Sequence, residues 1–420
     1  MQEKQKVNQK EECKETELCL LPENWNILGF NKCINKERIK VGNVKKQNYK
    51  KSGKFPIVDQ GQNLIAGYWD VADDVYKGKL PVIIFGDHTR IVKYVEFPFV
   101  CGADGTKIIL PNLNLIYPKF FYYALKNTDI PSRGYNRHYS ILRKKKIVCP
   151  PIQEQKKIAG VLSAVQEAKE KTEEVIKSSK ELKKSLMKHL FTYGPVSIEE
   201  AEKIKTKETE FGYQPTEWNQ YNLGHIARVR GGYGFPHRYQ GEKTGKYPFF
   251  KVSDMNTPGN EIFMTKANNY IEDDIIDKLK AKLFSKNTVI FPKVGAALHT
   301  NKKRILSSDS LIDNNVMGVT IVAPETCEPL FLLNFFHLIN LSNLSNPGPL
   351  PSINGNTVKK LNLYIPPIQI QKKIVDILSS IEKKIEAEEN KKKVLEELFK
   401  TLLNNLMTGK IRVHNLCIEI

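Results

Sequence analysis

An acid next to a histidine is the feature of this 420-residue chain that comes closest to a catalytic site. Asp87 and His88 adjoin in the stretch FGDHTR (85–90). A carboxylate and an imidazole can serve in a hydrolytic triad, but neighbours on an extended segment point apart, and no serine or cysteine motif accompanies them. A turn after the predicted buried strand 81–85 explains the stretch equally well. If the stretch has a function, His88 and Arg90 are better suited to contact DNA than to catalyse a reaction.

Two glycine-rich stretches have the composition of nucleotide-binding loops but not their spacing. GEKTGK (241–246) has one residue too few between its glycines for a phosphate loop, and Tyr247 follows where Ser or Thr would bind magnesium. RGGYG (230–234) leads into Phe235-Pro236, a poor start for the helix of a dinucleotide site. We predict a hairpin turn and a loop, and no catalytic residue.

The cysteines give no sign of a metal site or a disulfide framework. They form no C-x-x-C pair and have no histidine at zinc-ligand spacing. They occupy positions 13, 19, 33, 101, 149, 327 and 417. We therefore expect reduced cysteines, no metal ion and no cofactor on this chain.

Residues suited to reading DNA bases gather in the first part of the chain. Arg, Asn and Gln can pair bidentately with guanine or adenine, whereas Lys mainly neutralises phosphate. The best base-reading candidate is SRGYNRHYS (132–140), a polar segment around Gly134; a surface loop that touches only phosphate or solvent is the alternative. RKKK (143–146) is better suited to phosphate. The candidate contacts are Gln60, Gln62, Asn63, His88, Arg90, Arg133, Asn136, Arg137, His138, Arg143 and Lys144.

A second group of candidates lies in the later part of the chain. GGYGFPHRY (231–239) is a loop, and KVSDMN (251–256) and LHTNKKR (298–304) follow predicted strands. Segments just past a strand commonly carry function. The candidate contacts here are Tyr233, His237, Arg238, Lys251, Ser253, His299, Asn301, Lys302 and Arg304.

The positive charge is concentrated in two blocks. The chain carries a net charge of +19. Residues 26–149 hold 22 Lys and Arg against 9 Asp and Glu, and residues 219–365 hold 17 against 11, so these blocks account for the whole excess. A polyanion bound at two separate places would require this distribution.

Two phrases that frame these blocks occur twice. KETELCLLPENW (14–25) returns as KETEFGYQPTEW (207–218) with six of twelve residues identical. PPIQEQKKI (150–158) returns as PPIQIQKKI (366–374) with eight of nine identical. The chain is therefore an internal repeat, in which each half has a framing phrase, a basic block and a PPIQ phrase.

Each PPIQ phrase opens a segment that predicts a long amphipathic helix. Apolar residues recur at three- and four-residue steps without proline, and the proline pair lies where a helix start tolerates it. A helix of about 43 residues would be about 60 Å long. The predicted apolar seam contains Ile158, Val161, Val165, Ala168, Val175, Leu182 and Leu186 in the first helix and Ile374, Ile377, Ile381, Leu395, Leu398, Leu402 and Leu406 in the second.

Chain connectivity predicts how the two helices pair. The ends of a compact domain usually lie close together, so the second helix should begin where the first stops and run back antiparallel to bury its seam. We predict an α+β protein: two mixed α/β domains separated by an antiparallel coiled coil, with pseudo-two-fold symmetry. The predicted parts are 1–149 (first domain), 150–193 (first helix), 194–365 (joint and second domain), 366–409 (second helix) and 410–420 (tail).

With these features the chain resembles the DNA sequence-specificity (S) subunits of type I restriction-modification enzymes. The resemblance is carried by the P-x-x-W phrases (Pro22 and Trp25, Pro215 and Trp218) and by the doubled PPIQ helix starts, and it covers nearly all residues. It implies two target-recognition domains that each read one half of a split site in double-stranded DNA. The helices would set the spacing and dock two modification (methyltransferase) subunits, which restriction subunits join.

The resemblance also implies that chemistry occurs on the partners. S-adenosylmethionine would serve adenine methylation with base flipping, and ATP and Mg²⁺ would serve cleavage. A structural or RNA-binding coiled-coil protein is the alternative, but it leaves the duplicated phrases unexplained; an autonomous enzyme is disfavoured by the missing cofactor motifs. No stretch approaches the roughly 20 apolar residues of a membrane span, and the charged start lacks a signal peptide, so we expect a cytoplasmic protein.

Overall fold

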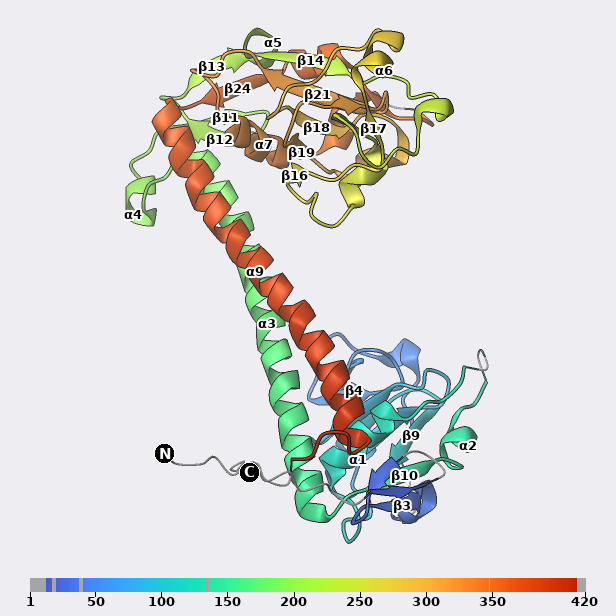
Figure 1. Ribbon diagram of the computed structural model, residues 1–420. Coiled ribbons are helices and arrows are strands. Elements are labelled where there is room, and N and C mark those ends of the chain that lie inside the picture. Colours follow the sequence, from blue (N-terminus) through green and yellow to red (C-terminus); the bar gives the residue numbers. More distant parts are fainter. Residues whose placement is uncertain are drawn as a thin grey trace, which may run out of the picture. The chain divides into compact units, whose positions relative to one another are not determined.

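The computed structural model describes residues 13–16, 20–37, 41–132, 134, 136–346 and 348–413. The chain forms two compact units: unit 1 contains residues 1–174 and 388–420, and unit 2 contains residues 175–387 (Figure 1). Within the described ranges, no helix combines the length and apolar character that a membrane crossing requires.

Two long helices contribute to both units. The first, α3, spans Ile152–Tyr193, and the second, α9, spans Ile368–Met407. Each begins directly after its proline pair, as the repeat predicts. The backbone of Gly194 after α3 has a φ of 85°, and that of Gly409 after α9 has a φ of 71°. Both values lie in the left-handed region, where glycine commonly ends a helix.

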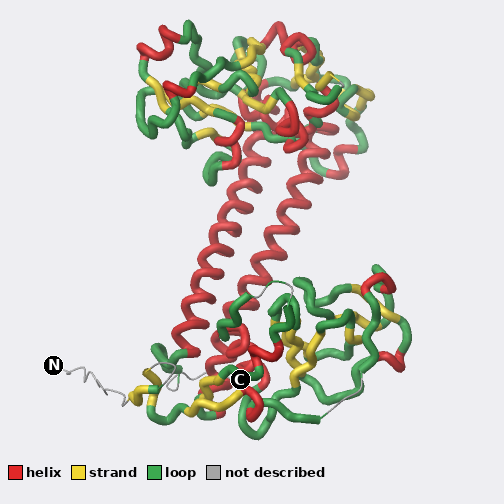
Figure 2. Tube along the Cα trace, turned by 90° about the vertical axis from the view of Figure 1, so that its right-hand side faces the viewer, coloured by secondary structure: helices red, strands yellow, loops and turns green. Residues whose placement is uncertain are grey.

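The described residues of unit 1 outside the long helices form short strands and short helices (Figure 2). Its strands are β1 (Cys13–Glu15), β2 (Leu20–Pro22), β3 (Asn26–Gly29), β4 (Phe55–Val58), β5 (Gly67–Trp69), β6 (Val82–Gly86), β7 (Val92–Val95), β8 (Val100–Cys101), β9 (Thr106–Ile109) and β10 (Lys146–Cys149). Its short helices are α1 (Pro118–Asn127) and α2 (Tyr139–Leu142). Two three-stranded sheets have the orders β5-β4-β8 and β7-β6-β9, and β3 pairs with β10.

Unit 2 repeats this plan with additional strands. Its strands are β11 (Thr206–Thr209), β12 (Gly212–Pro215), β13 (Asn219–Asn222), β14 (Ala227–Gly231), β15 (Tyr247–Phe250), β16 (Phe263–Met264), β17 (Tyr270–Ile271), β18 (Val289–Pro292), β19 (Arg304–Leu306), β20 (Leu311–Ile312), β21 (Val316–Ile321), β22 (Ser345–Asn346), β23 (Ser352–Ile353) and β24 (Asn362–Ile365). Its short helices are α4 (Ile198–Ala201), α5 (Leu223–Ile226), α6 (Asp273–Lys278), α7 (Pro329–Leu338) and α8 (Gly355–Lys359). The main sheet has the order β14-β21-β18-β19-β16, beside a sheet β17-β15-β20.

The strand pairings of the two units correspond. In unit 1, β4 pairs parallel with β8, and β6 pairs antiparallel with β7 and β9. In unit 2, β15 pairs parallel with β20, and β18 pairs antiparallel with β19 and β21. The predicted α+β class with an internal repeat is therefore confirmed, whereas the predicted domain boundaries remain predictions.

The central strand of each unit is buried on both faces. Every residue of β6 is buried, and alternate side chains enter different apolar clusters, because successive side chains of a strand point to opposite faces. Ile83 and Phe85 pack in the cluster that contains residues of α1, and Val289 and Phe291 pack in the cluster that contains residues of α7. The sheets are thus anchored to their short helices by the same strand positions in both units.

A buried glutamine secures the start of α3. Gln155 is 1 % exposed. Its Oε1 accepts a hydrogen bond from the Tyr117 backbone N–H at 2.7 Å, and its Nε2 donates to the main-chain oxygens of Pro150 at 2.8 Å and Leu115 at 3.2 Å. The side chain therefore joins the first turn of α3 to the chain that enters α1.

The equivalent glutamine secures the start of α9. Gln371 is fully buried. Its Oε1 accepts from the Glu328 backbone N–H at 2.8 Å, and its Nε2 donates to the main-chain oxygens of Pro366 and Thr326, both at 2.8 Å. The second Gln of each PPIQ-x-Q phrase thus makes the same contacts in both units.

The buried face of α3 differs in its middle from the predicted seam. It contains Ile158, Leu162, Val165, Lys169, Thr172, Ile176, Ser179, Lys183, Leu186 and Leu190, all buried or half-buried. Val175 and Leu182 are 37 % and 52 % exposed, so their assignment to the seam is wrong. Val175 precedes Ile176 by one residue and therefore lies about 100° around the helix from it. The Thr172 hydroxyl donates to the Ala168 carbonyl at 2.8 Å, which lets a polar residue occupy the buried face.

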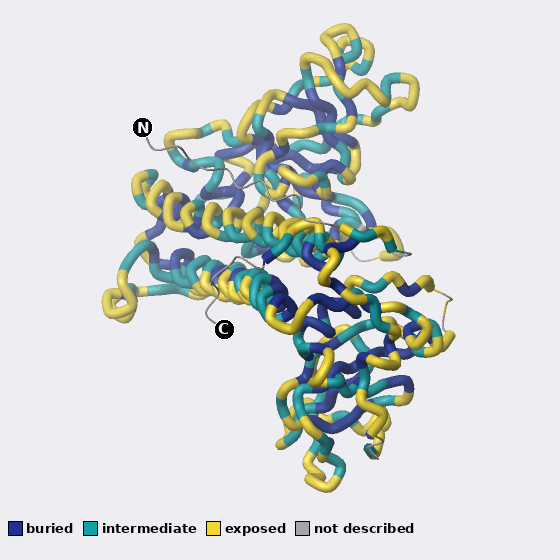
Figure 3. The backbone as a smooth tube through the Cα atoms, turned by 60° about the horizontal axis from the view of Figure 1, so that its bottom comes forward, coloured by how far each residue is buried: buried dark blue, intermediate teal, exposed yellow. Residues whose placement is uncertain are grey.

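The buried face of α9 shows the same difference. Ile377 and Leu398 are 37 % and 42 % exposed, so they too do not belong to the seam. Exposed residues are interspersed with half-buried and buried ones along both helices (Figure 3). The buried face of α9 contains Gln371, Ile374, Leu378, Ile381, Ile385, Glu388, Lys392, Leu395, Phe399, Leu402 and Leu406, all buried or half-buried.

Ion pairs connect α3 and α9 inside each unit. In unit 1, the Lys392 ammonium lies 3.0 Å from the Glu173 carboxylate, and the Lys169 ammonium lies 3.9 Å from that of Glu396. In unit 2, Lys183 pairs with Glu382. Most of these side chains are substantially exposed, so each pair contributes only about 0–1 kcal/mol.

Candidate nucleic-acid interface

Three loops of unit 1 are joined into one cluster. They are the segments 59–66, 87–91 and 102–105, which follow β4, β6 and β8, and we call them the first loop cluster. Gln60 joins all three. Its Nε2 donates to the Asp104 main-chain oxygen at 2.8 Å, and its Oε1 accepts from the His88 backbone N–H at 3.1 Å. Because the amide of Gln60 has these internal partners, its predicted contact with a base remains a prediction without further support.

The other candidates in the first loop cluster lie nearer the solvent. Gln62, Asn63 and Arg90 are exposed, and His88 is half-buried. Arg90 has a φ of 62°, in the left-handed region, and its guanidinium donates to the Ile130 main-chain oxygen at 2.9 Å. The cluster thus presents polar side chains on a hydrogen-bonded frame.

Asp87 connects this cluster to the segment before α2. The side chain is 2 % exposed, and its Oδ1 accepts from the Tyr139 backbone N–H at 2.8 Å. Its main-chain oxygen accepts from the His138 backbone N–H at 2.8 Å. The Lys107 ammonium lies 3.8 Å from its Oδ2. Asp87 therefore supports the loop, which favours the turn interpretation of FGDHTR over the catalytic one.

The prediction that His138 contacts DNA is wrong. The residue is fully buried, and its Nδ1 lies 2.9 Å from the Asp87 main-chain oxygen. A ring enclosed in this way cannot reach a base edge. Asn136 and Arg137 are exposed in the same segment, whereas Arg133 lies outside the described residues. Their DNA contacts remain predictions.

The basic run before β10 is exposed, as contact with phosphate requires. Arg143 and Lys144 are both exposed. The Arg143 Nε donates to the Asn31 Oδ1 at 3.4 Å, and the residue remains exposed. Both side chains therefore remain candidates for phosphate contacts.

Four candidates in unit 2 are exposed: His237, Arg238, Ser253 and His299. The Arg238 guanidinium lies 4.8 Å from the centre of the Tyr239 ring, a cation–π contact. His299 Nδ1 lies 3.3 Å from the Ser342 Oγ. These side chains face solvent and stay available as predicted contacts.

Tyr233 and Lys251, two further candidates in unit 2, have partners inside the domain. The Tyr233 ring packs against two apolar clusters, and its hydroxyl accepts from the Lys282 backbone N–H at 2.9 Å. The Lys251 ammonium donates to the Gln240 side-chain oxygen at 3.0 Å. Contacts of Tyr233 or Lys251 with DNA would compete with these hydrogen bonds, and the placement of the two side chains does not favour such contacts.

The last three candidates surround a buried lysine. Lys303 is fully buried, and its ammonium donates to the Asn301 side chain and the Ile339 main chain, both at 2.7 Å; burial lowers its pKa to about 8. Lys302 donates to the Asn256 side chain. Arg304 is half-buried, and burial lowers its pKa. Asn301, Lys302 and Arg304 therefore belong to a supporting network, and base contacts by them remain predictions.

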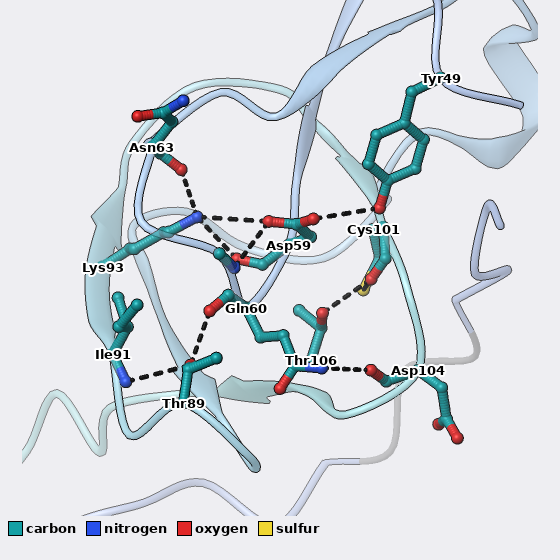
Figure 4. A network of polar contacts seen from close by, with 12 residues as sticks. Tyr49, Asp59, Gln60, Asn63, Thr89, Ile91, Lys93, Cys101, Asp104 and Thr106 are labelled. Atoms are coloured by element: carbon teal, nitrogen blue, oxygen red, sulfur yellow. Dashed lines mark hydrogen bonds and ion pairs between the residues drawn. The ribbon is translucent and has the colours of Figure 1, made fainter. Parts of the chain in front are cut away.

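Sequence reasoning overlooked a buried ion pair between β7 and the first loop cluster. The Lys93 ammonium lies 3.6 Å from the Asp59 carboxylate, with the two side chains 5 % and 8 % exposed (Figure 4). The alternation in VKYV, where Lys93 and Val95 must share a face, could have indicated it. Burial lowers the pKa of Lys93, and the Asp59 charge opposes this shift.

The described residues form no metal cluster, and burial makes two of their thiols unreactive. Within those ranges no group of three His, Cys, Asp or Glu side chains could hold a metal ion. Burial raises the pKa of the Cys33 and Cys101 thiols to about 12, so they are poor nucleophiles. Cys19 and Cys417 lie outside the described residues.

Known proteins are similar to this chain in sequence and in fold. A putative type I restriction enzyme MjaX specificity subunit from Methanocaldococcus jannaschii is 26 % identical over 96 % of this chain and 97 % of its own length. The EcoR124I/EcoR124II specificity subunit from Escherichia coli is 22 % identical over 81 % of this chain and 82 % of its own. The crystal structure of a type I restriction-modification S subunit from M. genitalium covers 91 % of this chain and 96 % of its own, with a TM-score of 0.60 and 17 % identity.

The model of one protein family matches most of the chain in two segments. The family is described as the type I restriction modification DNA specificity domain, and the matched residues are 33–181 and 215–397. The two segments correspond to the two halves of the internal repeat. The chain therefore belongs to the type I restriction-modification DNA specificity family.

Proposed function

We propose that this chain is the DNA specificity subunit of a type I restriction-modification complex, and that each unit contributes one domain that reads half of a split DNA site. The observation that carries this proposal is the duplicated framework around two differing, positively charged blocks (26–149 and 219–365), in a chain of the specificity family. Phosphate contacts by such charge give affinity, and polar side chains on differing loops give sequence choice.

The long helices would set the distance between the half-sites. Two helices of 42 and 40 residues without interruption support this role, because a helix has a fixed rise per residue. The ion pairs inside unit 1 support an antiparallel coiled coil, since Lys169 pairs with Glu396 and the later Glu173 pairs with the earlier Lys392.

Modification subunits would dock on the helices. Val175, Leu182 and Ile377 in unit 2 and Val394 and Leu398 in unit 1 are apolar and exposed, and a partner that covered them would gain free energy. One solved structure with a TM-score of 0.52 concerns complex assembly of a type I R-M system. Methylation with S-adenosylmethionine, and ATP- and Mg²⁺-dependent cleavage with restriction subunits, would then take place on those partners, in the cytoplasm.

Methylation mapping tests the proposal. The chain is combined with its modification subunits and duplex DNA of random sequence, and methylated sites are sequenced. We expect two short specific sequences separated by a fixed unspecified gap. Exchange of residues 26–149 for the block of another family member should change one half-site and keep the other. Methylation without a split site, a change in both half-sites, or preferred binding of single-stranded RNA would contradict the proposal.

A further inference from the structure

A single buried lysine closes the loop that follows β4. Lys93 Nζ donates to the main-chain oxygens of Asp59 at 2.7 Å and Asn63 at 2.5 Å (Figure 4). These two residues are the ends of the segment 59–63. The same ammonium forms the ion pair with the Asp59 carboxylate. Lys93 therefore holds both ends of the segment in place.

Asp59 holds the interior of the same segment. Its Oδ1 accepts from the Gly61 backbone N–H at 2.8 Å, and its Oδ2 accepts from the Tyr49 hydroxyl at 3.3 Å. A Cβ atom on Gly61 would lie 3.0 Å from Oδ1, so a larger residue would force the carboxylate to move. Gln62 and Asn63 are left as the exposed polar side chains of a constrained segment.

The chemistry of this pair suits positioning better than stability. Taking two charges out of water costs free energy, whereas burying an apolar pair of the same volume does not. A buried ion pair is therefore a weak stabiliser. An ammonium, however, can direct bonds at two carbonyl groups and a carboxylate at once. An apolar pair could fill the space but would leave the two ends of segment 59–63 free to shift.

Unit 2 has a second cation at the corresponding strand position. Lys93 of β7 lies opposite Ile84 of β6, and Arg304 of β19 lies opposite Ile290 of β18. Arg304 reaches the segment after β15, where its guanidinium donates to the Met255 main-chain oxygen at 3.3 Å. Two cations at equivalent positions thus each hold the loop after an equivalent strand, although the loop sequences differ.

We propose that Lys93, paired with Asp59, is a positioning residue that holds segment 59–63 in the conformation that reads one half of the DNA site. Arg304 does the same for segment 251–256 and the other half. This inference rests on the proposed function. Neither cation needs to touch DNA. Each sets the specificity of one half-site through the main chain of the loop that it holds.

Methylation specificity measured with the modification subunits tests this proposal. The substrates are duplexes that carry each single-base change in either half-site. The double variant Asp59→Asn/Lys93→Met removes both buried charges together. We expect its discrimination against single-base changes to fall about tenfold in one half-site only, since a well-placed base contact supplies about that much discrimination. Arg304→Met should relax the other half-site. Lys93→Arg should keep most of the discrimination, and Lys77→Met, at an exposed lysine of unit 1, should change nothing.

Two further measurements separate positioning from other roles. The slope of affinity against salt should stay unchanged in the double variant, because a buried ammonium releases no phosphate counterion. Thermal unfolding establishes that each variant is folded; if the double variant is not, Arg304→Met decides the proposal on its own half-site. Unchanged discrimination in a folded variant, or equal loss in both half-sites, overturns the proposal. A wild-type complex that recognises no split site refutes the proposed function instead.

Discussion

The segment after β4 in unit 1 and the segment after β15 in unit 2 leave equivalent strands but are held differently. In unit 1 the acid is Asp59, directly after the strand, and it pairs with Lys93. In unit 2 that position is Lys251, and the buried acid is Asp254, whose carboxylate accepts from the Lys251 backbone N–H at 2.7 Å and the Asn268 side chain at 2.6 Å. The loops that follow these corresponding strands therefore differ, because a buried acid at a different position holds each of them.

The starts of the long helices show the opposite behaviour. Gln155 and Gln371 make the same bonds to the main chain in both units. One residue earlier, however, the units differ: Glu154 is buried in unit 1, and Ile370 takes its place in unit 2. Contacts that fix the helix start are thus the same in both units, while neighbouring contacts are free to differ. Three predictions sharpen this contrast.

The largest effect is expected at the buried carboxylate of unit 1. Glu154 is 4 % exposed, accepts from the Trp25 indole at 2.9 Å, and receives the Arg412 guanidinium at 2.6 Å and 2.9 Å. Arg412→Met should lower the free energy of unfolding by about 3–5 kcal/mol, because it leaves a buried charge without its cation. Chemical denaturation followed by circular dichroism measures the loss.

The double variant Glu154→Ile/Arg412→Met provides the control for this prediction. It gives unit 1 the apolar residue that unit 2 has at Ile370 and removes both charges. Replacing a buried pair by apolar groups is often close to neutral, so we expect the double variant to recover most of the stability. A double variant as unstable as Arg412→Met alone would show that the charges are not what distinguishes the two helix starts.

The second effect concerns the contacts that the units share. Gln155→Leu and Gln371→Leu should each cost about 2–4 kcal/mol, because each leaves buried backbone groups without hydrogen bonds. The exposed first glutamines of the same phrases supply matched controls, and Gln153→Leu and Gln369→Leu should leave the free energy of unfolding nearly unchanged. A large cost in one unit and none in the other would contradict the equivalence of the two helix starts.

The same contrast explains what the sequence could predict. The repeat, the long helices and their proline starts follow from local patterns, and the structure agrees with them. The seam was misassigned at Val175 and Leu182, which are apolar, because the half-buried positions beside them belong to Ile176 and to Lys183. Lys183 pairs with Glu382 on the other helix, and a local apolar pattern does not show such a partner.

The candidate site was less predictable, because exposure depends on partners distant in sequence. His138 has the residue type of a base-reading side chain, but the oxygen of Asp87 that binds its ring lies 51 residues away. The roles of Lys93 and Asp59 likewise required the packing of β7 against the loop after β4. Residue type alone therefore did not show which of the candidate side chains are exposed and which are held by partners inside the domain.

The smallest effect concerns two buried lysines that differ in their partners. Lys93 has the Asp59 carboxylate beside it, whereas Lys303 bonds only to neutral oxygens, and burial lowers its pKa from 10.5 to about 8. Between these pH values the unfolded chain binds more protons at Lys303 than the folded chain does, so the free energy of unfolding should rise with pH.

Relative to Lys303→Met, wild-type protein should gain at most about 3 kcal/mol in free energy of unfolding as the pH rises across this window. Tyrosines titrate alike in both proteins and cancel in the difference. The difference in free energy of unfolding between wild-type protein and Lys93→Met should depend more weakly on pH over the same range. Curves of stability against pH that run parallel for wild type and Lys303→Met would contradict the burial of an uncompensated ammonium.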